Sequence, residues 1–268
     1  MIRKLYNKIS SILSTKRNTP KKTYEDDVYI VSYPKSGNTW VRFLVGNYIT
    51  GNKLNFENYN YVIPDIHYNP NQCKNIERPR FIKSHFSYKK KYPKVVYIVR
   101  DGRDVAVSYY NYLIKMGNIG RGTTFTRFMD DFNSGSVGQY GVWSEHVESW
   151  IEKNRNNILA VRYEDLLADA STQLRRILSF ADIEVRKSDL QKAVEASKFE
   201  NMKKMEEEQN QKEGKNFPGK GSADEEKRFM RKGERGDWQD WFDEELLREF
   251  ESTHRAGLIC GEYPVYSQ

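Results

Sequence analysis

Four short apolar runs constrain the fold more than any other feature of this 268-residue sequence. They are VYIVSY at 28–33, RFIKSH at 80–85, KVVYIVR at 94–100 and ILAVRY at 158–163. Runs rich in β-branched and aromatic residues are typical of buried strands. Between and after them, apolar residues recur at helical spacing over 104–116, 140–154, from 164 through LRRILSFA, and from 237 to about 256. This alternation predicts a single α/β domain whose mostly parallel sheet carries helices on both faces.

A candidate anion-binding loop, YPKSGNTW at 33–40, joins the first run to the apolar helical pattern that follows it. Gly37 permits close backbone approach, and the amides of residues 36–39 would point together at the start of a helix. Lys35 adds a charge, while Ser36 and Thr39 add hydroxyl groups. Such an arrangement binds oxyanions, although an ordinary strand-to-helix turn is the alternative. The triphosphate loop GxxxxGK[ST] does not match, because here the lysine precedes the glycine.

A second candidate anion site follows the run at 94–100. Arg100 leaves the end of this strand, and Ser108 lies on the next helix, where side chains tilt back toward the helix start. An arginine, a hydroxyl group and a helix N-terminus together would hold a phosphate. The structural alternative is a salt bridge from Arg100 to Asp104 or Asp101.

A third stretch, RKGERGDW at 231–238, has two cations, a glycine and a helix start after Asp237. If this stretch is considered without the other two, a solvated run of charges is the simplest explanation for it. The formal charge of +7 and pI near 9.1 admit nucleic acid, a membrane surface or a phosphorylated small molecule as partner. Many of the basic residues stand singly in loops after strands, which favours a compact ligand.

Together, the three stretches resemble the PAPS-dependent sulfotransferase family. YPKSGNTW resembles its 5′-phosphosulfate loop, the spacing from Arg100 to Ser108 its 3′-phosphate site, and RKGERGDW its RKGxxGDW signature. The order along the chain also matches, and the resemblance covers residues 28 to about 242. It implies a P-loop-like strand-loop-helix and the donor adenosine 3′-phosphate 5′-phosphosulfate (PAPS). The product would be adenosine 3′,5′-bisphosphate (PAP), and no metal would be required.

The resemblance also implies roles for individual residues. The loop that grips the 5′ group would comprise Lys35, Ser36, Gly37, Asn38, Thr39 and Trp40, with Trp40 near the adenine. The residues expected at the 3′-phosphate are Arg100, Ser108, Arg231, Lys232 and Gly233. Tyr163 and Phe199 match positions that contact adenine in relatives. His85 matches the catalytic histidine, and the catalytic set would also include Lys35, Lys83 and Ser108.

Chemistry supports His85 independently of the resemblance. An acceptor hydroxyl group, or an amine, must lose a proton as it attacks sulfur, and imidazole has the side-chain pKa nearest neutrality. The transfer would resemble phosphoryl transfer, with in-line attack and charge stabilisation by the protein. Lys35 would neutralise charge on the departing phosphate. A histidine hydrogen-bonded to backbone at a strand end is the structural alternative.

The sequence departs from the family at a few positions. Asn38 replaces a frequent threonine and keeps a hydrogen-bonding side chain, and Gly102 stands where many relatives have proline. No clear match to the dimerisation motif of animal cytosolic members is visible near the C-terminus, so the oligomeric state is left open.

Two other classes of function are alternatives to a sulfotransferase. A nucleotide kinase using the Lys35 loop would need a magnesium-binding hydroxyl, which Ser36 could supply, and a strand-end aspartate, for which we find no convincing candidate. A non-enzymatic module that binds RNA or membrane would need a continuous basic stripe interleaved with aromatics, which is absent. A small-molecule acceptor, rather than nucleic acid, is therefore the predicted partner.

The domain organisation follows from composition. Residues 1–24 read as a basic, helical N-terminal appendage, 25–268 as the sulfotransferase domain, and the polar segment 201–230 as a mobile lid or surface loop. No apolar stretch approaches the roughly 20 residues of a spanning helix, and the first residues are too polar for a signal peptide. Cys73 and Cys260 lie in no metal or redox spacing. The sequence predicts a cytoplasmic protein without stable membrane insertion.

The acceptor pocket is expected from residues after Ile49, the segment 52–79, the loop 115–140 and the lid. The segment 52–79 contributes three tyrosines, namely Tyr59, Tyr61 and Tyr68. Acidic residues in the lid, at 206–208, could favour a cationic acceptor such as an amine, although a solvated charge run is the simpler explanation. The identity of the acceptor is not predicted.

Overall fold

The computed structural model of the protein describes residues 22–68, 70–151, 155–213 and 233–267. The predicted N-terminal appendage, residues 1–24, therefore lies almost wholly outside the described residues. The same holds for most of the predicted lid and for Arg231 and Lys232 of the third motif.

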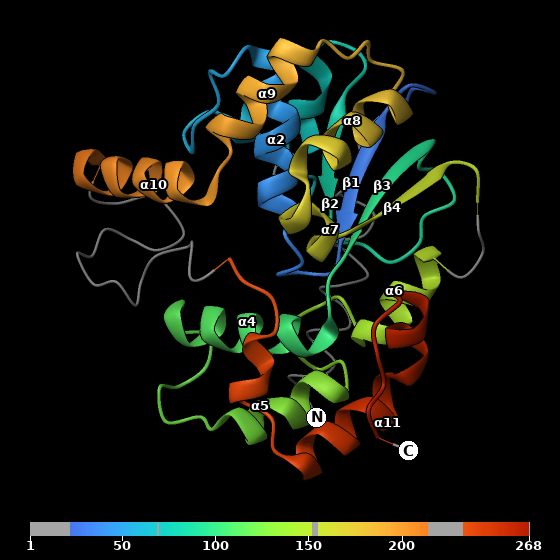
Figure 1. Cartoon of the computed structure of the whole chain (residues 1–268), viewed down its shortest axis with the longest axis vertical. Coiled ribbons are helices and arrows are strands. Elements are labelled where there is room, and N and C mark those ends of the chain that lie inside the picture. Colours follow the sequence, from blue (N-terminus) through green and yellow to red (C-terminus); the bar gives the residue numbers. More distant parts are fainter. Residues whose placement is uncertain (1–21, 69, 152–154, 214–232, 268) are drawn as a thin grey trace.

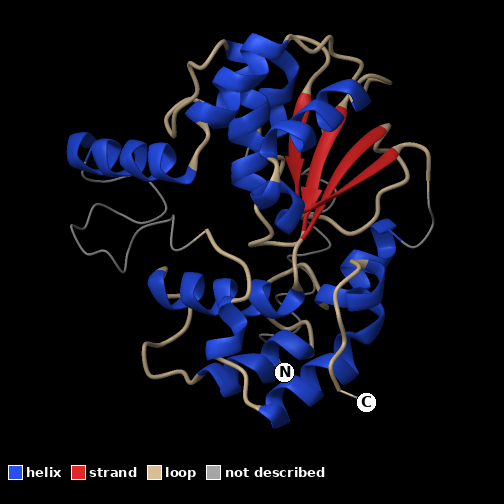
Figure 2. Ribbon diagram, in the orientation of Figure 1, coloured by secondary structure: helices blue, strands red, loops and turns tan. Residues whose placement is uncertain are grey.

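A four-stranded parallel sheet forms the centre of the molecule (Figure 2). The strands are β1 (Val28–Ser32), β2 (Phe81–Ser84), β3 (Lys94–Val99) and β4 (Ile158–Arg162), in the order β2-β1-β3-β4. Each corresponds to one predicted apolar run. Val28 of β1 stands opposite both Phe81 and Lys94, so the carboxyl ends of three strands lie near one another. Ligands of such sheets bind beyond these ends.

Helices cover both faces of the sheet, so the predicted fold class is confirmed (Figure 1). One face packs on α2 (Asn38–Thr50), α7 (Tyr163–Ala168), α8 (Ala170–Phe180) and α9 (Lys187–Ala196); the other packs on α4 (Gly102–Lys115), α5 (Phe125–Asn133), α6 (Trp143–Ile151) and α11 (Glu244–Cys260). Side chains alternate along each strand: Val28 and Ile30 join the first layer, whereas Tyr29 and Val31 join the second. Because both sides of the central strands β1 and β3 are buried, these two strands read as continuous apolar runs, whereas the edge strand β4 is only partly buried.

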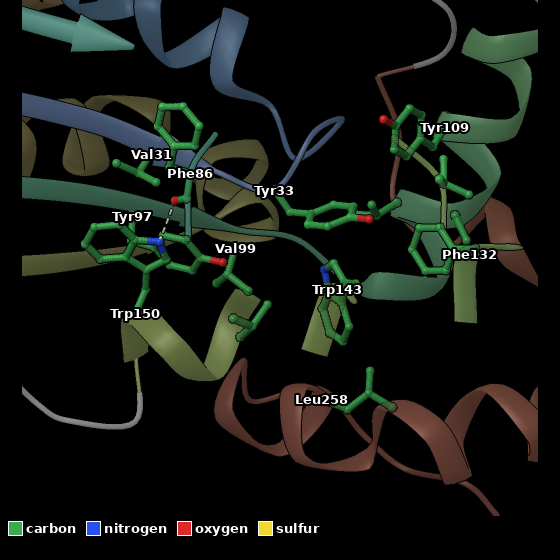
Figure 3. Close-up of a cluster of buried hydrophobic side chains, with 14 of the residues drawn as sticks. Val31, Tyr33, Phe86, Tyr97, Val99, Tyr109, Phe132, Trp143, Trp150 and Leu258 are labelled. Carbon is green, nitrogen blue, oxygen red and sulfur yellow. Dashed lines mark hydrogen bonds between the residues drawn. The ribbon is translucent and has the colours of Figure 1, made fainter. Parts of the chain in front are cut away.

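Large aromatic side chains fill the core under β1 and β3 (Figure 3). The indole nitrogen of Trp150 donates a 3.0 Å hydrogen bond to the Phe86 carbonyl oxygen, which lies just beyond β2. Tyr33, just beyond β1, donates a 3.1 Å bond to the Gly141 carbonyl oxygen. Buried aromatic rings with satisfied polar groups are strongly stabilising. They fix the chain where it leaves the strands, at the edge where a ligand would bind.

Several predicted helices are divided differently in the structure. The helix expected from residue 164 is two helices, because Asp169 ends α7 and its carboxylate caps α8 by accepting from the Thr172 amide at 2.9 Å. The helix expected over 237–256 begins as a short 3-10 turn, η3 (Asp237–Asp240). Asp243 then caps α11, which continues to Cys260. The segment 52–79 contains α3 (Tyr59–Val62) and a 3-10 turn, η1 (Pro70–Asn75).

The described part of the predicted lid is helical. The expectation of a loop is wrong for residues 201–213, which belong to α10 (Phe199–Glu213), a helix that extends away from the body in Figure 1. Met202 anchors this helix in a small cluster with Phe43, Leu54 and Phe56. None of the described helices is long and apolar enough to cross a membrane.

Candidate active site

The loop between β1 and α2 has the backbone geometry of an anion cradle. Lys35 and Gly37 adopt φ values of 71° and 95°, so both lie in the left-handed region. Gly37 is required here, since a Cβ atom at this position would lie 2.6 Å from the ring of Tyr163. The Ser36 hydroxyl group is buried and has no hydrogen-bond partner in the described structure. A buried, unpaired donor at a helix start fits an oxyanion ligand.

Arg100 joins all three predicted anion-binding stretches. Its Nη1 donates to the Lys35 carbonyl oxygen at 3.3 Å, and its Nη2 donates to the Glu234 carbonyl oxygen at 2.8 Å. The alternative salt bridge is also present, but Asp104 is 3.8 Å from Nη2. The Nε of Arg100 is buried without a partner among the described residues, so a donor remains for an anionic ligand.

The third stretch is held against α4 by backbone contacts. The Asp104 carboxylate accepts hydrogen bonds from the Gly236 amide at 2.8 Å and the Trp238 amide at 3.1 Å. Gly233 has φ 70°, and a Cβ atom there would lie 2.6 Å from the ring of Phe199. The glycine thus allows this loop to reach the start of α10.

These elements enclose one cavity of about 500 Å³. The predicted residues that line it are Lys35, Gly37, Asn38, Thr39, Trp40, Lys83, His85, Arg100, Ser108, Tyr163, Phe199 and Gly233. Ser36 is buried behind this lining, and Arg231 and Lys232 lie outside the described residues. The structure therefore brings together residues that are up to almost 200 positions apart in the sequence.

Two of the loop residues also support the architecture. The side-chain nitrogen Nδ2 of Asn38 donates to the Ile30 carbonyl oxygen at 3.2 Å and to the Ser32 hydroxyl at 3.3 Å, which ties the loop to β1. The Trp40 indole nitrogen donates to the Ser197 carbonyl oxygen at 2.9 Å, and its ring packs edge-on against Tyr163 at 5.8 Å. These aromatic rings form one end of the cavity.

His85 is held in one tautomer at the carboxyl end of β2. Its Nδ1 lies 2.7 Å from the Ser32 carbonyl oxygen, which can only accept, so Nδ1 carries the proton. In the neutral ring, Nε2 then has a free lone pair. Burial, reinforced by the charge of Lys83 and by His67, holds the pKa of His85 well below 6.5. The ring is consequently neutral at physiological pH and can accept a proton.

Two further histidines fix the backbone of His85. The His67 Nε2 accepts from the His85 amide at 2.8 Å, and the His146 Nε2 donates to the His85 carbonyl oxygen at 3.1 Å. Burial lowers the pKa of both supporting histidines to about 4. All three rings are therefore neutral near pH 7, and the structural alternative of a backbone-bonded histidine is compatible with a role as base.

Lys83 is ion-paired with Asp65 beside this histidine cluster. Burial raises the pKa of the Asp65 carboxyl, but the charge of Lys83, with smaller contributions from His67 and Arg42, outweighs it and leaves that pKa below its usual value. The pair is buried in the wall of the cavity. Lys83 therefore acts in a local network, rather than as an isolated cation.

Sequence reasoning missed several residues of the cavity wall. They are Arg42, Tyr109, Tyr112 and Leu167, whereas Asp65, His67, Gln139 and Tyr140 come from the expected segments 52–79 and 115–140. Tyr59 and Tyr68 line the cavity as expected, whereas Tyr61 is 66% exposed and does not. One available signal was Arg42, a charged residue in the otherwise apolar run VRFLV of α2.

Comparisons with known proteins agree with this geometry. A family model described as a sulfotransferase domain matches residues 25–258. Mouse sulfotransferase 1E1 is 30% identical over 260 residues, covering 87% of this chain and 83% of its own length. Rabbit amine sulfotransferase is 29% identical, with 80% and 75% covered. The crystal structure of mouse sulfotransferase SULT7A1 complexed with PAP superposes with a TM-score of 0.69 at 26% identity, covering 93% and 90% of the two chains.

A parallel sheet with an anion-binding loop beyond β1 is typical of enzymes that bind nucleotides and transfer groups from them. More narrowly, the chain belongs to the sulfotransferase family. The predicted family and the predicted class of enzyme are thereby confirmed.

Proposed function

We propose that this cavity binds PAPS and that the enzyme transfers its sulfonyl group to a hydroxyl group of a small organic acceptor. The observation that carries the proposal is the convergence of all three motifs and His85 on one cavity. The complex of the mouse relative with PAP supports the nature of the donor.

Different residues of the chain would bind different parts of PAPS. Lys35, the loop amides and the Ser36 hydroxyl would hold the 5′ group, and the unpaired Nε of Arg100 with Ser108 would hold the 3′-phosphate. The aromatic rings of Trp40, Tyr163 and Phe199 would surround the adenine. Arg231 and Lys232 are assigned to the same phosphate from sequence alone.

The chemical step follows from the tautomer of His85. Nε2 takes the proton of the acceptor hydroxyl group while its oxygen attacks sulfur, and the bond from sulfur to the phosphate oxygen breaks on the opposite side. Lys35 stabilises the negative charge that develops on the departing phosphate. Lys83 and Ser108 position the reacting groups. The proposal includes no metal ion.

Thermal unfolding with candidate nucleotides tests the donor. PAP should raise the melting temperature strongly, whereas ATP with magnesium should not, because a ligand that binds only the native state stabilises it. Equal shifts would favour a kinase instead. Sulfonyl transfer from PAPS to a panel of phenols, measured with and without EDTA, tests the reaction. Loss of turnover in EDTA would contradict the metal-free mechanism.

A further inference from the structure

We propose that the natural acceptor carries a negative charge and that Arg42 binds it, so that the substrate is a small hydroxylated aromatic acid. The inference rests on the proposed function, because it concerns the acceptor end of the same cavity. The argument starts from Arg42, which extends from α2 one turn after Asn38, is 3% exposed and lines the cavity.

The guanidinium of Arg42 is only partly used by the protein. Its Nη2 donates to the Tyr59 carbonyl oxygen at 3.4 Å, to the Asn60 side-chain oxygen at 2.7 Å and to the Ile63 carbonyl oxygen. These bonds hold the short helix α3 in place. Nε, in contrast, is buried without a hydrogen-bond partner among the described residues. Arginine has five donors, so donors remain for a ligand.

No carboxylate of the described residues forms a close ion pair with Arg42. Asp65 acts on Arg42 electrostatically, but its closest partner is Lys83, and it also accepts from the His67 amide at 2.9 Å. His67 and His85 are neutral, so Arg42, Lys83 and Asp65 leave one net positive charge at this end of the cavity. A buried charge without a close counter-ion is costly, even where hydrogen bonds satisfy some of its donors. An anionic group on the acceptor would supply the missing partner.

Aromatic side chains form most of the remaining acceptor wall. The tyrosines that line it are Tyr59, Tyr68, Tyr109, Tyr112 and Tyr140. Among the described lining residues, the only aliphatic side chains are those of Pro34 and Leu167. Such a wall suits a planar ring with polar substituents better than the aliphatic faces of a steroid. The Tyr59 ring also covers the Arg42 guanidinium at 4.3 Å.

A cationic acceptor finds less support. Glu206, the first acidic residue of the lid run, is buried and is absent from the described cavity lining. Asp65 is neutralised by Lys83. Among the described residues, the acceptor end of the cavity therefore carries a net positive charge, which favours an anionic acceptor over a cationic one.

Three phenols with the same reacting group test the proposal: 4-hydroxyphenylacetate, 4-ethylphenol and tyramine, which are anionic, neutral and cationic. In the wild-type protein, kcat/KM for PAP formation should be about 10- to 100-fold higher for the anion than for the neutral phenol, as expected for one charge-assisted hydrogen bond. Arg42→Met should remove most of this ratio, and Arg42→Lys should keep part of it. Arg127→Met, which removes a surface arginine absent from the cavity lining, should keep the full ratio.

The ratio separates the proposal from a purely structural role, because loss of the α3 contacts alone would slow all three phenols together. Thermal stabilisation by PAP shows whether each variant is folded. If no phenol reacts, calorimetric titration of PAP-loaded protein with phenylacetate replaces the assay. Equal kcat/KM values for the anionic and the neutral phenol would overturn the inference of an anionic acceptor, and so would undiminished phenylacetate binding by Arg42→Met. Neither result would count against the proposed function. Absence of stabilisation by PAP would count against the proposed function instead.

Discussion

Replacing Arg100 by methionine is the sharpest test of how the three anion-binding stretches are held together. The substitution preserves a long apolar side chain but removes the donors to the Lys35 and Glu234 carbonyl oxygens. It also removes the cation that lies 4.4 Å from the centre of the Tyr163 ring. The loop that follows β1 and the loop at 233–236 would then lose their shared contact.

The magnitude follows from these contacts. A hydrogen bond from a charged group contributes about 1.5–3 kcal/mol. The 2.8 Å bond to the Glu234 carbonyl oxygen should contribute this full amount, and the longer 3.3 Å bond to the Lys35 carbonyl oxygen only part of it. The substitution should therefore lower the free energy of unfolding by about 2–4 kcal/mol. Asp104 keeps its two amide donors, which limits the cost. Loss of one further bond to the 3′-phosphate should weaken PAP binding by about 10- to 100-fold.

Urea unfolding and calorimetric titration with PAP measure the two effects separately. Arg127→Met serves as control, because Arg127 is 60% exposed and its ion pairs lie on the surface. Its urea midpoint and its PAP affinity should match those of the wild type. Arg100→Lys should restore little, since an ammonium group cannot reproduce the fork of donors. A PAP affinity unchanged in Arg100→Met would refute the placement of Arg100 at the 3′-phosphate.

The remaining predictions concern the base and the glycine loop. His85→Asn should lower kcat by about 10²- to 10⁴-fold, because the general base is lost. The affinity for PAP, measured by calorimetry, should be nearly unchanged. Undiminished turnover would exclude His85 as the base. Because the pKa of His85 lies well below 6.5, its active neutral form persists on acidification. The kcat/KM for a neutral phenol should therefore stay level from pH 8 to about pH 6, whereas a base of ordinary pKa would be half protonated at about 6.5. Gly233→Ala should reduce PAP affinity and lower the melting temperature more than Gly117→Ala. Both positions have positive φ, but only at Gly233 would the new Cβ atom meet a ring, that of Phe199; equal effects would mean that this contact is unimportant.

Local sequence was sufficient for the strands and for the anion-binding loop. The central strands β1 and β3 are buried on both faces, so their apolar runs are continuous and can be recognised without knowledge of their neighbours. The loop at 33–40 depends on residues adjacent in the chain, because Gly37 and the start of α2 create the cradle together. Helix boundaries were less predictable, since single capping residues such as Asp169 and Asp243 divide patterns that look continuous.

Contacts between distant segments were decided by the tertiary structure alone. The sequence shows four histidines without a close pair, yet the fold brings His67 and His146 to the backbone of His85 and fixes its tautomer through the Ser32 carbonyl oxygen. It also determines that Asp65 pairs with Lys83, and that Arg42 forms no close ion pair with any of the described residues. Hydrogen bonds and charges act over a few ångströms in space, and spacing along the chain does not determine those distances when a sheet and its crossover helices intervene.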